Sequence, residues 1–314
     1  MRALVVGADG FAGRWLLRHL VESGDEVAAA VGPGYGDEAL PANLDPLRLD
    51  VRDPDGVHRV VTSSQPDVIY YLAGVSRAGA RDDLDLAIGI SVHGALNTLA
   101  AAADLDGPIR LVHIGSSHVY ATPANEEPID ERAPIQPTSV YGAAKAAAES
   151  ALQYLGAAAG VEVIAVRAFN HTGPGQQPGF VVPSLARQVI EIERGAKEPI
   201  IRAGDLDARR DFTDVRDVVR AYRLAAVHGV PGEAYNVASG RAIRVHEILD
   251  ELLGLRSVRA EVEQDLTLSR AGEPTTAMVG DAGKLTALTG WRPEITIQQS
   301  LVGVLDSVVE HIPG

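Results

Sequence analysis

The first 170 residues alternate between short apolar runs and amphipathic stretches. The apolar runs are too short for core helices and predict buried strands. They fall at Arg2–Val6, Glu26–Val31, Leu47–Val51, Pro66–Gly74, Ile109–Ile114 and Val161–Phe169. Helical stretches separate them, among them Val57–Ser64 and the long Leu84–Ala103. Strands that alternate with helices predict a doubly wound α/β fold, in which helices cover a parallel sheet on both faces.

Beyond Gly173 the alternation loosens. We expect helices at Val182–Arg194, Val245–Leu253, Lys284–Thr289 and Ile297–His311, strands at Pro199–Gly204 and Glu233–Val237, and a segment Arg209–Asp217 that leads into a helix ending near His228. This half is interpreted as a smaller, interleaved C-terminal substrate-binding domain. The predicted division gives residues 1–170, with about 212–238, to the sheet domain, and residues 171–211 and 239–314 to the smaller domain.

The first predicted strand runs into the turn Gly7-Ala8-Asp9-Gly10-Phe11-Ala12-Gly13 and then into a helix. In a dinucleotide-binding turn the first glycine permits the bend, the second lets the backbone approach a pyrophosphate, and the third lets helix and strand pack closely. The helix N-terminus adds free N–H groups and a positive dipole end. A glycine-rich turn without a ligand can have the same spacing, but its position after the first strand favours a dinucleotide site that includes Phe11.

Further cofactor contacts are predicted where other strands end. Leu72, Ala73 and Gly74 close the fourth predicted strand, and the small residues there let a cofactor approach the backbone. Asp50 and Val51 close the third predicted strand. Asp50 can accept a hydrogen bond from an adenine amino group or can cap the turn that follows, and the sequence leaves both readings open.

The residue that separates NAD from NADP is missing from its usual place. An Asp or Glu near the end of the second strand holds the ribose 2′-hydroxyl of NAD, and an Arg nearby suits the 2′-phosphate of NADP. Here Gly32-Pro33-Gly34-Tyr35-Gly36 follows that strand, with Asp37 directly after it. NAD and NADP therefore both stay open at this point.

Tyr141 and Lys145 stand four residues apart, so they share one face of a helix. An ammonium beside a phenol favours the phenolate, and we expect it to lower the tyrosine pKa toward the range of a general acid or base. A lone pair of this kind is more often a solvated helix face. Ser116, which follows the fifth predicted strand, supplies the polar partner that a chance pair would lack.

Composition narrows the classes of function. A net charge of −14 argues against general nucleic-acid binding, and it means that an anionic ligand needs a local cluster of arginines. The chain contains no cysteine, which excludes disulfides, thiol nucleophiles and zinc–thiolate sites, and no metal site is predicted. We find no apolar run long enough for a membrane span, and the N-terminus is predicted to be a strand rather than a signal peptide. We expect a cytoplasmic protein with neither a membrane nor a nucleic-acid partner.

Taken together, the glycine turn, Ser116 and the Tyr141 and Lys145 pair resemble the extended short-chain dehydrogenase/reductase superfamily over essentially the whole chain, which implies a Rossmann sheet. Three further segments, Arg167–Gln176, Ala208–Asp217 and Tyr235–Gly240, resemble the nucleotide-diphosphosugar branch of that superfamily. The combination is most similar to GDP-6-deoxy-4-keto-mannose reductases, which make GDP-rhamnose, and to their relatives the GDP-mannose 4,6-dehydratases.

The resemblance implies a mechanism and a set of binding residues. Hydride passes from the reduced nicotinamide to C4 of a keto sugar, Tyr141 protonates the C4 oxygen, Ser116 holds that oxygen, and Lys145 also binds the nicotinamide ribose. The resemblance favours NADP over NAD, although the basic residue that family reductases place after the second strand is absent. The implied substrate-binding residues are Ser76, Ser117, His118, Asn170, Arg210, Arg270 and Glu273, with the arginines on the diphosphate.

Position 118 bears on which reaction is catalysed. Dehydratases of this group carry a Glu or Asp there, which removes the C5 proton so that water can leave from C6, whereas this chain has His118. A neutral histidine can act as a base, bind the substrate or face solvent. The sequence favours the reductase, with a 4,6-dehydratase or a nucleotide-sugar 4-epimerase, each holding NAD(P) tightly, as alternatives. A non-catalytic NAD(P)-binding sensor is a further alternative.

The resemblance also implies a quaternary structure. Families of this kind commonly pair the helices that correspond here to Leu84–Ala103 and Tyr141–Leu155 into a four-helix bundle between two subunits. The apolar content of both helices permits such a bundle. We therefore expect a homodimer.

Overall fold

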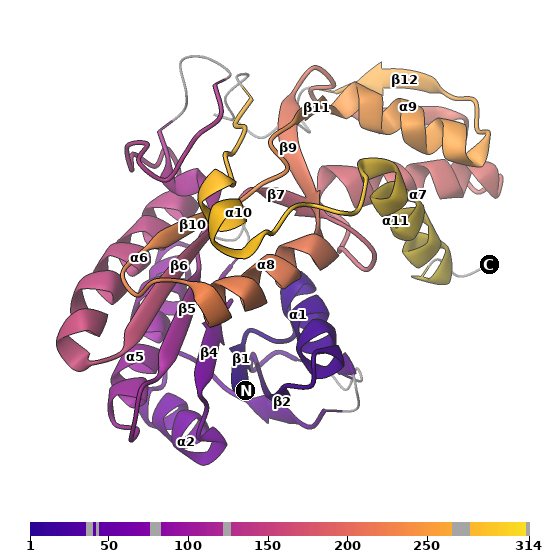
Figure 1. Cartoon of the computed structure of the whole chain (residues 1–314). Helices are drawn as coiled ribbons and strands as arrows, with labels where there is room; N and C mark the ends of the chain where they lie inside the picture. Colours follow the sequence, from indigo (N-terminus) through magenta and orange to yellow (C-terminus); the bar gives the residue numbers. More distant parts are fainter. Residues whose placement is uncertain (36–39, 42–43, 76–82, 122–126, 266–276, 312–314) are drawn as a thin grey trace.

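A seven-stranded parallel sheet lies at the centre of the computed structural model, which describes residues 1–35, 40–41, 44–75, 83–121, 127–265 and 277–311 (Figure 1). The strands lie in the order β10-β6-β5-β4-β1-β2-β3, and all neighbours are parallel. Their bounds are β1 Arg2–Val6, β2 Glu26–Val31, β3 Pro46–Arg48, β4 Val68–Tyr71, β5 Arg110–Ile114, β6 Glu162–Ala168 and β10 Ala234–Val237. The predicted doubly wound sheet is confirmed.

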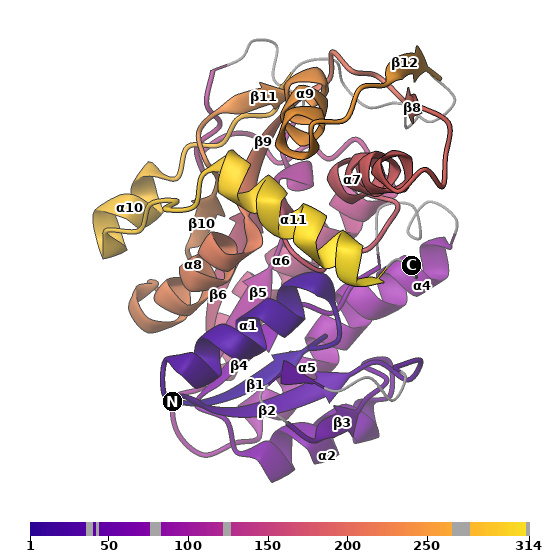
Figure 2. The same cartoon turned by 90° about the vertical axis from the view of Figure 1, so that its right-hand side faces the viewer.

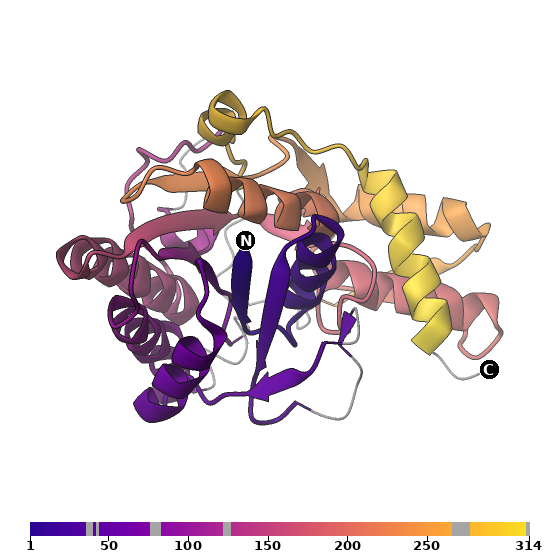
Figure 3. The same ribbon diagram turned by 60° about the horizontal axis from the view of Figure 1, so that its bottom comes forward.

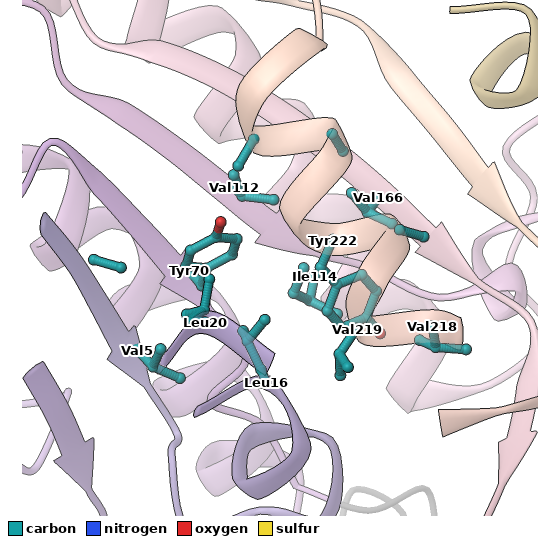
Figure 4. Close-up of a cluster of buried hydrophobic side chains, with 14 of the residues drawn as sticks. Val5, Leu16, Leu20, Tyr70, Val112, Ile114, Val166, Val218, Val219 and Tyr222 are labelled. Atoms are coloured by element: carbon teal, nitrogen blue, oxygen red, sulfur yellow. The ribbon is translucent and has the colours of Figure 1, made fainter. Parts of the chain in front are cut away.

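Successive side chains of a strand point to opposite faces of the sheet, and helices cover both faces, so side chains on both sides are buried. On one face lie α1 (Phe11–Glu22), α8 (Val215–His228) and α10 (Gly283–Thr289). Figure 4 shows this layer, with Leu16, Leu20, Val219 and Tyr222 of the helices over Val5, Tyr70 and Val112 of the strands. The opposite face packs on α2 (Pro54–Ser64), α5 (Ala95–Ala103) and α6 (Val140–Ala159). Burial on both sides explains why the strands are nearly continuous apolar runs.

The predicted helix Leu84–Ala103 consists of α4 (Leu84–Ile88), a π-helical turn (Gly89–Gly94) and α5. The Tyr71 hydroxyl donates to the carbonyl of Ile90 inside the widened turn, and a Cβ on Gly94 would overlap that hydroxyl. By length and composition this helix could cross a membrane, whereas the sequence analysis found no apolar run long enough to do so. Half of its most apolar window is buried inside the fold, as in the core helix of a globular domain.

A second group of elements begins where β6 ends (Figures 1 and 2). It contains the three-stranded sheet β11 (Ala242–Arg244), β9 (Arg209–Asp214) and β7 (Asn170–Thr172), the pair β12 (Glu261–Gln264) and β8 (Ile200–Ala203), and the helices α7 (Val181–Glu193), α9 (Val245–Arg256) and α11 (Ile297–His311). The three helices share a separate apolar core that includes Val189, Leu249 and Leu301. Figure 3 shows α11, in yellow, beside α7 and α9 at one side of the molecule.

The short strands are where the structure departs from the sequence-based expectation. The strands β7, β11 and β12 were not predicted, and the segment that includes β9 was expected only as a lead into a helix. Each is brief and carries polar residues, and its pairing partner is distant in sequence, so local alternation gives little signal. The third strand is also shorter than expected: it ends at Arg48, before Asp50 and Val51.

Candidate active site

A cavity of about 300 Å³ is bordered by residues that follow strands β1, β4, β5 and β6. The carboxyl ends of parallel strands meet at one edge of a sheet, where ligands of such folds bind. The border includes the predicted site residues Gly7, Gly10, Phe11, Gly13, Leu72, Ser116, Ser117, His118, Tyr141, Lys145 and Asn170. Residues predicted as three separate groups, for cofactor, chemistry and sugar, therefore share one cavity.

The glycine turn has the geometry of a phosphate cradle. Gly7 has a φ of +89°, and a Cβ there would lie 2.7 Å from the amide nitrogen of Ala73. A Cβ on Gly13 would overlap the Gly7 carbonyl oxygen, so the third glycine is needed for the close approach of α1 to the turn. The first turn of α1 contains no acidic residue, which leaves the positive end of its dipole available to a pyrophosphate.

Tyr141 lies in the first turn of α6, beside the 3₁₀ turn Ser117–Val119 that follows β5. Ser139 caps the helix by accepting a hydrogen bond from the Gly142 amide at 3.1 Å. A Cβ on Gly142 would overlap the His118 carbonyl oxygen, so only glycine allows the two turns to touch. This contact places the Ser116 hydroxyl close enough to hydrogen-bond Tyr141.

The pKa of Tyr141 departs from the expectation. Burial raises it, and the hydrogen bond from Ser116 lowers it by less, so the pKa of this phenol lies above its ordinary value. The predicted net lowering of the Tyr141 pKa is therefore wrong. The phenol is protonated at neutral pH, which is the form that a general acid needs.

Lys145 is 4% exposed and lies one turn along α6 from Tyr141. Its Nζ donates to the carbonyl of Ile114 at 2.9 Å, and a Cβ on Gly74 would lie 3.4 Å from it. Burial lowers the pKa of Lys145 to about 8. The ammonium is thus fixed between the ends of β4 and β5, at the border of the cavity.

A buried ion pair supports the same helix face. Glu149 continues the stripe of Tyr141 and Lys145 by one more turn, and its carboxylate accepts from Arg167 of β6. Both side chains are less than a tenth exposed. Arg167 also donates to the Tyr120 hydroxyl at 2.9 Å, so the pair ties α6 to β6 and to the segment after β5.

The loop after β6 closes one side of the cavity. The His171 ring stacks on Phe11 of the glycine turn with centroids 6.0 Å apart, and burial lowers the pKa of this histidine. Gln176 holds the loop by donating to the His171 carbonyl. The ring of His118 packs edge-on against the ring of Tyr141, with centroids 5.9 Å apart. Residue 118, where dehydratases of this group carry an acid, therefore lies beside the candidate proton donor.

Several lining residues were not predicted, among them His171, Gln176, Phe180 and Tyr222. His171 and Gln176 belong to the segment Arg167–Gln176, on which the family resemblance partly rests, so that segment could have indicated them as site residues. Tyr222 gave none, because its spacing on α8 is that of a core residue. Its hydroxyl is buried and has no hydrogen-bond partner among the described residues.

Other predicted residues lie away from the border of the cavity. Asp50 accepts from the Arg52 amide and from its guanidinium, which holds the pKa of Asp50 low, so the residue forms the turn cap that was one of its two readings. Val51 packs in the core under α5. Ala73 touches the glycine turn through its backbone.

Arg210 lies on β9, where its guanidinium donates to the Arg209 carbonyl at 2.8 Å. The carboxylate of the neighbouring Asp211 lies on the other side of the strand, where it accepts hydrogen bonds from the amides of Ser239 and Gly280. Three predicted site residues, Ser76, Arg270 and Glu273, lie outside the described residues, as does Asp37 after the second strand.

The comparisons with known proteins agree with this geometry. Residues 3–238 match the NAD dependent epimerase/dehydratase family. GDP-6-deoxy-D-mannose reductase of Pseudomonas aeruginosa is 35% identical over 306 residues, which cover 97% of this chain and 96% of that protein. The solved structure of RMD from Pseudomonas aeruginosa complexed with NADPH has a TM-score of 0.86 and 32% identity, over 99% of both chains. UDP-glucose 4-epimerase of Thermus thermophilus in complex with NAD has a TM-score of 0.87 and 28% identity, over 99% of this chain and 100% of that one.

These findings confirm the predicted nucleotide-sugar superfamily and its nicotinamide cofactor. They leave NAD and NADP open, because one similar structure contains NADPH and the other NAD. The fold, the glycine turn and the match over three quarters of the sequence lead to one conclusion. The chain belongs to the NAD-dependent epimerase/dehydratase family.

Proposed function

We propose that this protein reduces a 4-keto-6-deoxy nucleotide sugar at C4 with NADPH or NADH, converting GDP-4-keto-6-deoxy-mannose to GDP-rhamnose. The observation that carries the proposal is the composition of the cavity: Ser116, Tyr141 and Lys145 converge there, and His118 stands where a dehydratase has a carboxylate. Similarity to the Pseudomonas aeruginosa reductase over both full lengths supports the same reaction.

In this proposal the chain's own residues manage the proton and the oxygen. A bound reduced nicotinamide supplies the hydride. Tyr141, protonated because its buried phenol has a raised pKa, donates its proton to the C4 oxygen as negative charge develops there. The Ser116 hydroxyl holds the same oxygen. Lys145, anchored on the Ile114 carbonyl, uses its remaining protons to bind the nicotinamide ribose.

The substrate side of the proposal rests on Ser117, His118 and Asn170, which border the cavity near Tyr141. We assign the diphosphate to Arg210 and Arg270, a ribose hydroxyl to Glu273, and a sugar contact to Ser76; Arg210 alone of these four is described. Residues 1–170 with about 212–238 would then hold the cofactor, and residues 171–211 and 239–314 the nucleotide sugar.

We further propose a cytoplasmic homodimer. The helices α4 and α6 contact each other and carry exposed apolar side chains, with Leu84 52% and Tyr154 79% exposed. A second copy packed on these helices would cover them in a four-helix bundle. Light scattering of the purified protein tests this, and a monomer at micromolar concentration would contradict it.

The reaction is tested by product analysis. GDP-mannose is converted by an authentic 4,6-dehydratase, the protein is added with NADPH or NADH, and the sugar is identified by NMR. The proposal predicts one nicotinamide oxidised for each GDP-rhamnose formed. Conversion of GDP-mannose by the protein alone would indicate a dehydratase, and interconversion of C4 epimers without net oxidation would indicate an epimerase.

A further inference from the structure

Two arginines from different parts of the chain contact the same residue, Tyr35. Arg14 directly follows Gly13 in the first turn of α1, and Arg48 is the last residue of β3. Tyr35 follows β2 and lies between them. The strand pairing explains the convergence, because β2 pairs with β1 on one side and with β3 on the other, where Val31 lies opposite Arg48.

Contacts with Tyr35 hold both guanidinium groups at this place. The Arg14 guanidinium lies 5.9 Å from the centroid of the Tyr35 ring, and its Nε donates to the Asp9 carbonyl at 3.2 Å. Arg48 donates from Nη1 to the Tyr35 carbonyl. Tyr35 is only 9% exposed, so it is a rigid support rather than a surface side chain. In a protein of net charge −14, two arginines held on one residue create a local positive field.

The position of this cluster relates to the proposed cofactor site. A pyrophosphate at the N-terminus of α1 directs the adenosine toward the end of β2, where the ribose 2′ position is read. The end of β2 carries Gly32 instead of an acidic residue. Its amide donates to the Asp9 carboxylate at 3.3 Å, which makes Asp9 the competing feature, since a carboxylate suits the 2′-hydroxyl of NAD.

We propose that Arg14 and Arg48 bind the 2′-phosphate of NADPH and make the enzyme prefer NADPH over NADH. The inference rests on the proposed cofactor site and specifies its nucleotide. A guanidinium binds phosphate oxygens through paired N–H groups, and two of them on one support match a dianionic group. A search for a basic residue directly after β2 misses both arginines, because one comes from α1 and the other from β3.

The test compares two fragments that differ only by the 2′-phosphate, adenosine 2′,5′-bisphosphate and AMP, by calorimetry on the ligand-free protein. We expect the wild-type protein to bind the bisphosphate at least about 10-fold more tightly than AMP. Arg14→Met and Arg48→Met should each weaken the bisphosphate about 10-fold and leave AMP unchanged. Arg18→Met is the matched control, because Arg18 lies one turn further along α1 with its guanidinium over Trp15, and it should change neither affinity.

The outcomes separate this inference from the proposed function. Equal affinity for the two fragments, or an Arg18→Met effect as large as that of Arg14→Met, would overturn the 2′-phosphate site while leaving a dinucleotide site intact. A wild-type protein that binds neither fragment nor NADPH would overturn the cofactor site and this inference together. If Arg14→Met proves unstable, Arg14→Lys takes its place. Lysine keeps the positive charge but lacks the planar guanidinium, so we expect Arg14→Lys to lose part of the bisphosphate affinity.

Discussion

Lys145 should destabilise the folded protein at neutral pH. Burial lowers its pKa from 10.5 to about 8. One pKa unit corresponds to about 1.4 kcal/mol, so keeping the ammonium in the fold costs about 3 kcal/mol below pH 8. Methionine has a similar length and no charge. Lys145→Met removes that cost but takes the hydrogen bond from the Ile114 carbonyl, a loss of about 1 kcal/mol. We expect the variant to be about 2 kcal/mol more stable at pH 7.

The sign of the pH dependence follows from the direction of the shift. The pKa of Lys145 is lower in the folded state than in the unfolded chain, so the cost is complete below about pH 8 and shrinks as the pH rises toward 10.5. The advantage of Lys145→Met should therefore be largest at pH 7 and nearly gone at pH 10.

Urea unfolding of the ligand-free proteins at pH 7 and pH 10 measures this difference. Lys284→Met is the control, because Lys284 is partly exposed and forms an ion pair with Glu233, so its replacement should change stability by less than about 1 kcal/mol. A Lys145→Met protein that is less stable than wild type at pH 7, or whose advantage is the same at pH 10, would refute the reasoning.

Three further substitutions probe the support of the site. Gly142→Ala should lower turnover and cost about 2 kcal/mol, because its Cβ overlaps the His118 carbonyl; full turnover would contradict this. Arg167→Met should cost about 3–5 kcal/mol in urea unfolding by leaving Glu149 unpaired, and adding Glu149→Leu should restore most of it. Tyr70→Phe removes a buried hydroxyl without a partner among the described residues, so the melting temperature should rise rather than fall.

The central sheet could be predicted because its strands are buried on both faces. Leu4 and Val5 both face a core, so β1 reads as one apolar run, and the same holds for Ile69 and Tyr70 in β4. The strand β9 behaves differently. Every second residue of β9, Arg209, Asp211 and Thr213, is polar, so the strand does not form an apolar run. The buried Asp211 accepts hydrogen bonds from the amides of Ser239 and Gly280, which lie far away in the sequence, so no local pattern predicts its burial.

The candidate site shows the same limit. Helical spacing correctly placed Tyr141 and Lys145 on one face. The expected direction of the Tyr141 pKa shift was wrong, because burial of the phenol raises this pKa. The position of Gly142 against His118, and of Arg14 beside Tyr35, depends on elements brought together by folding. The spacing of residues within one segment can therefore predict which side chains share a face of a helix. Only the folded structure shows which residues of other segments contact that face.

The role of Tyr141 can be measured directly by single-turnover oxidation of NAD(P)H with the 4-keto sugar nucleotide. Tyr141→Phe is compared with Tyr154→Phe, a change on the same helix at a residue that does not border the cavity. We predict that Tyr141→Phe binds the cofactor as tightly as wild type but oxidises it at least about 100-fold more slowly, because the general acid is gone, while Tyr154→Phe matches wild type. A Tyr141→Phe enzyme that retains most of the wild-type rate would contradict the assignment of Tyr141 as the proton donor.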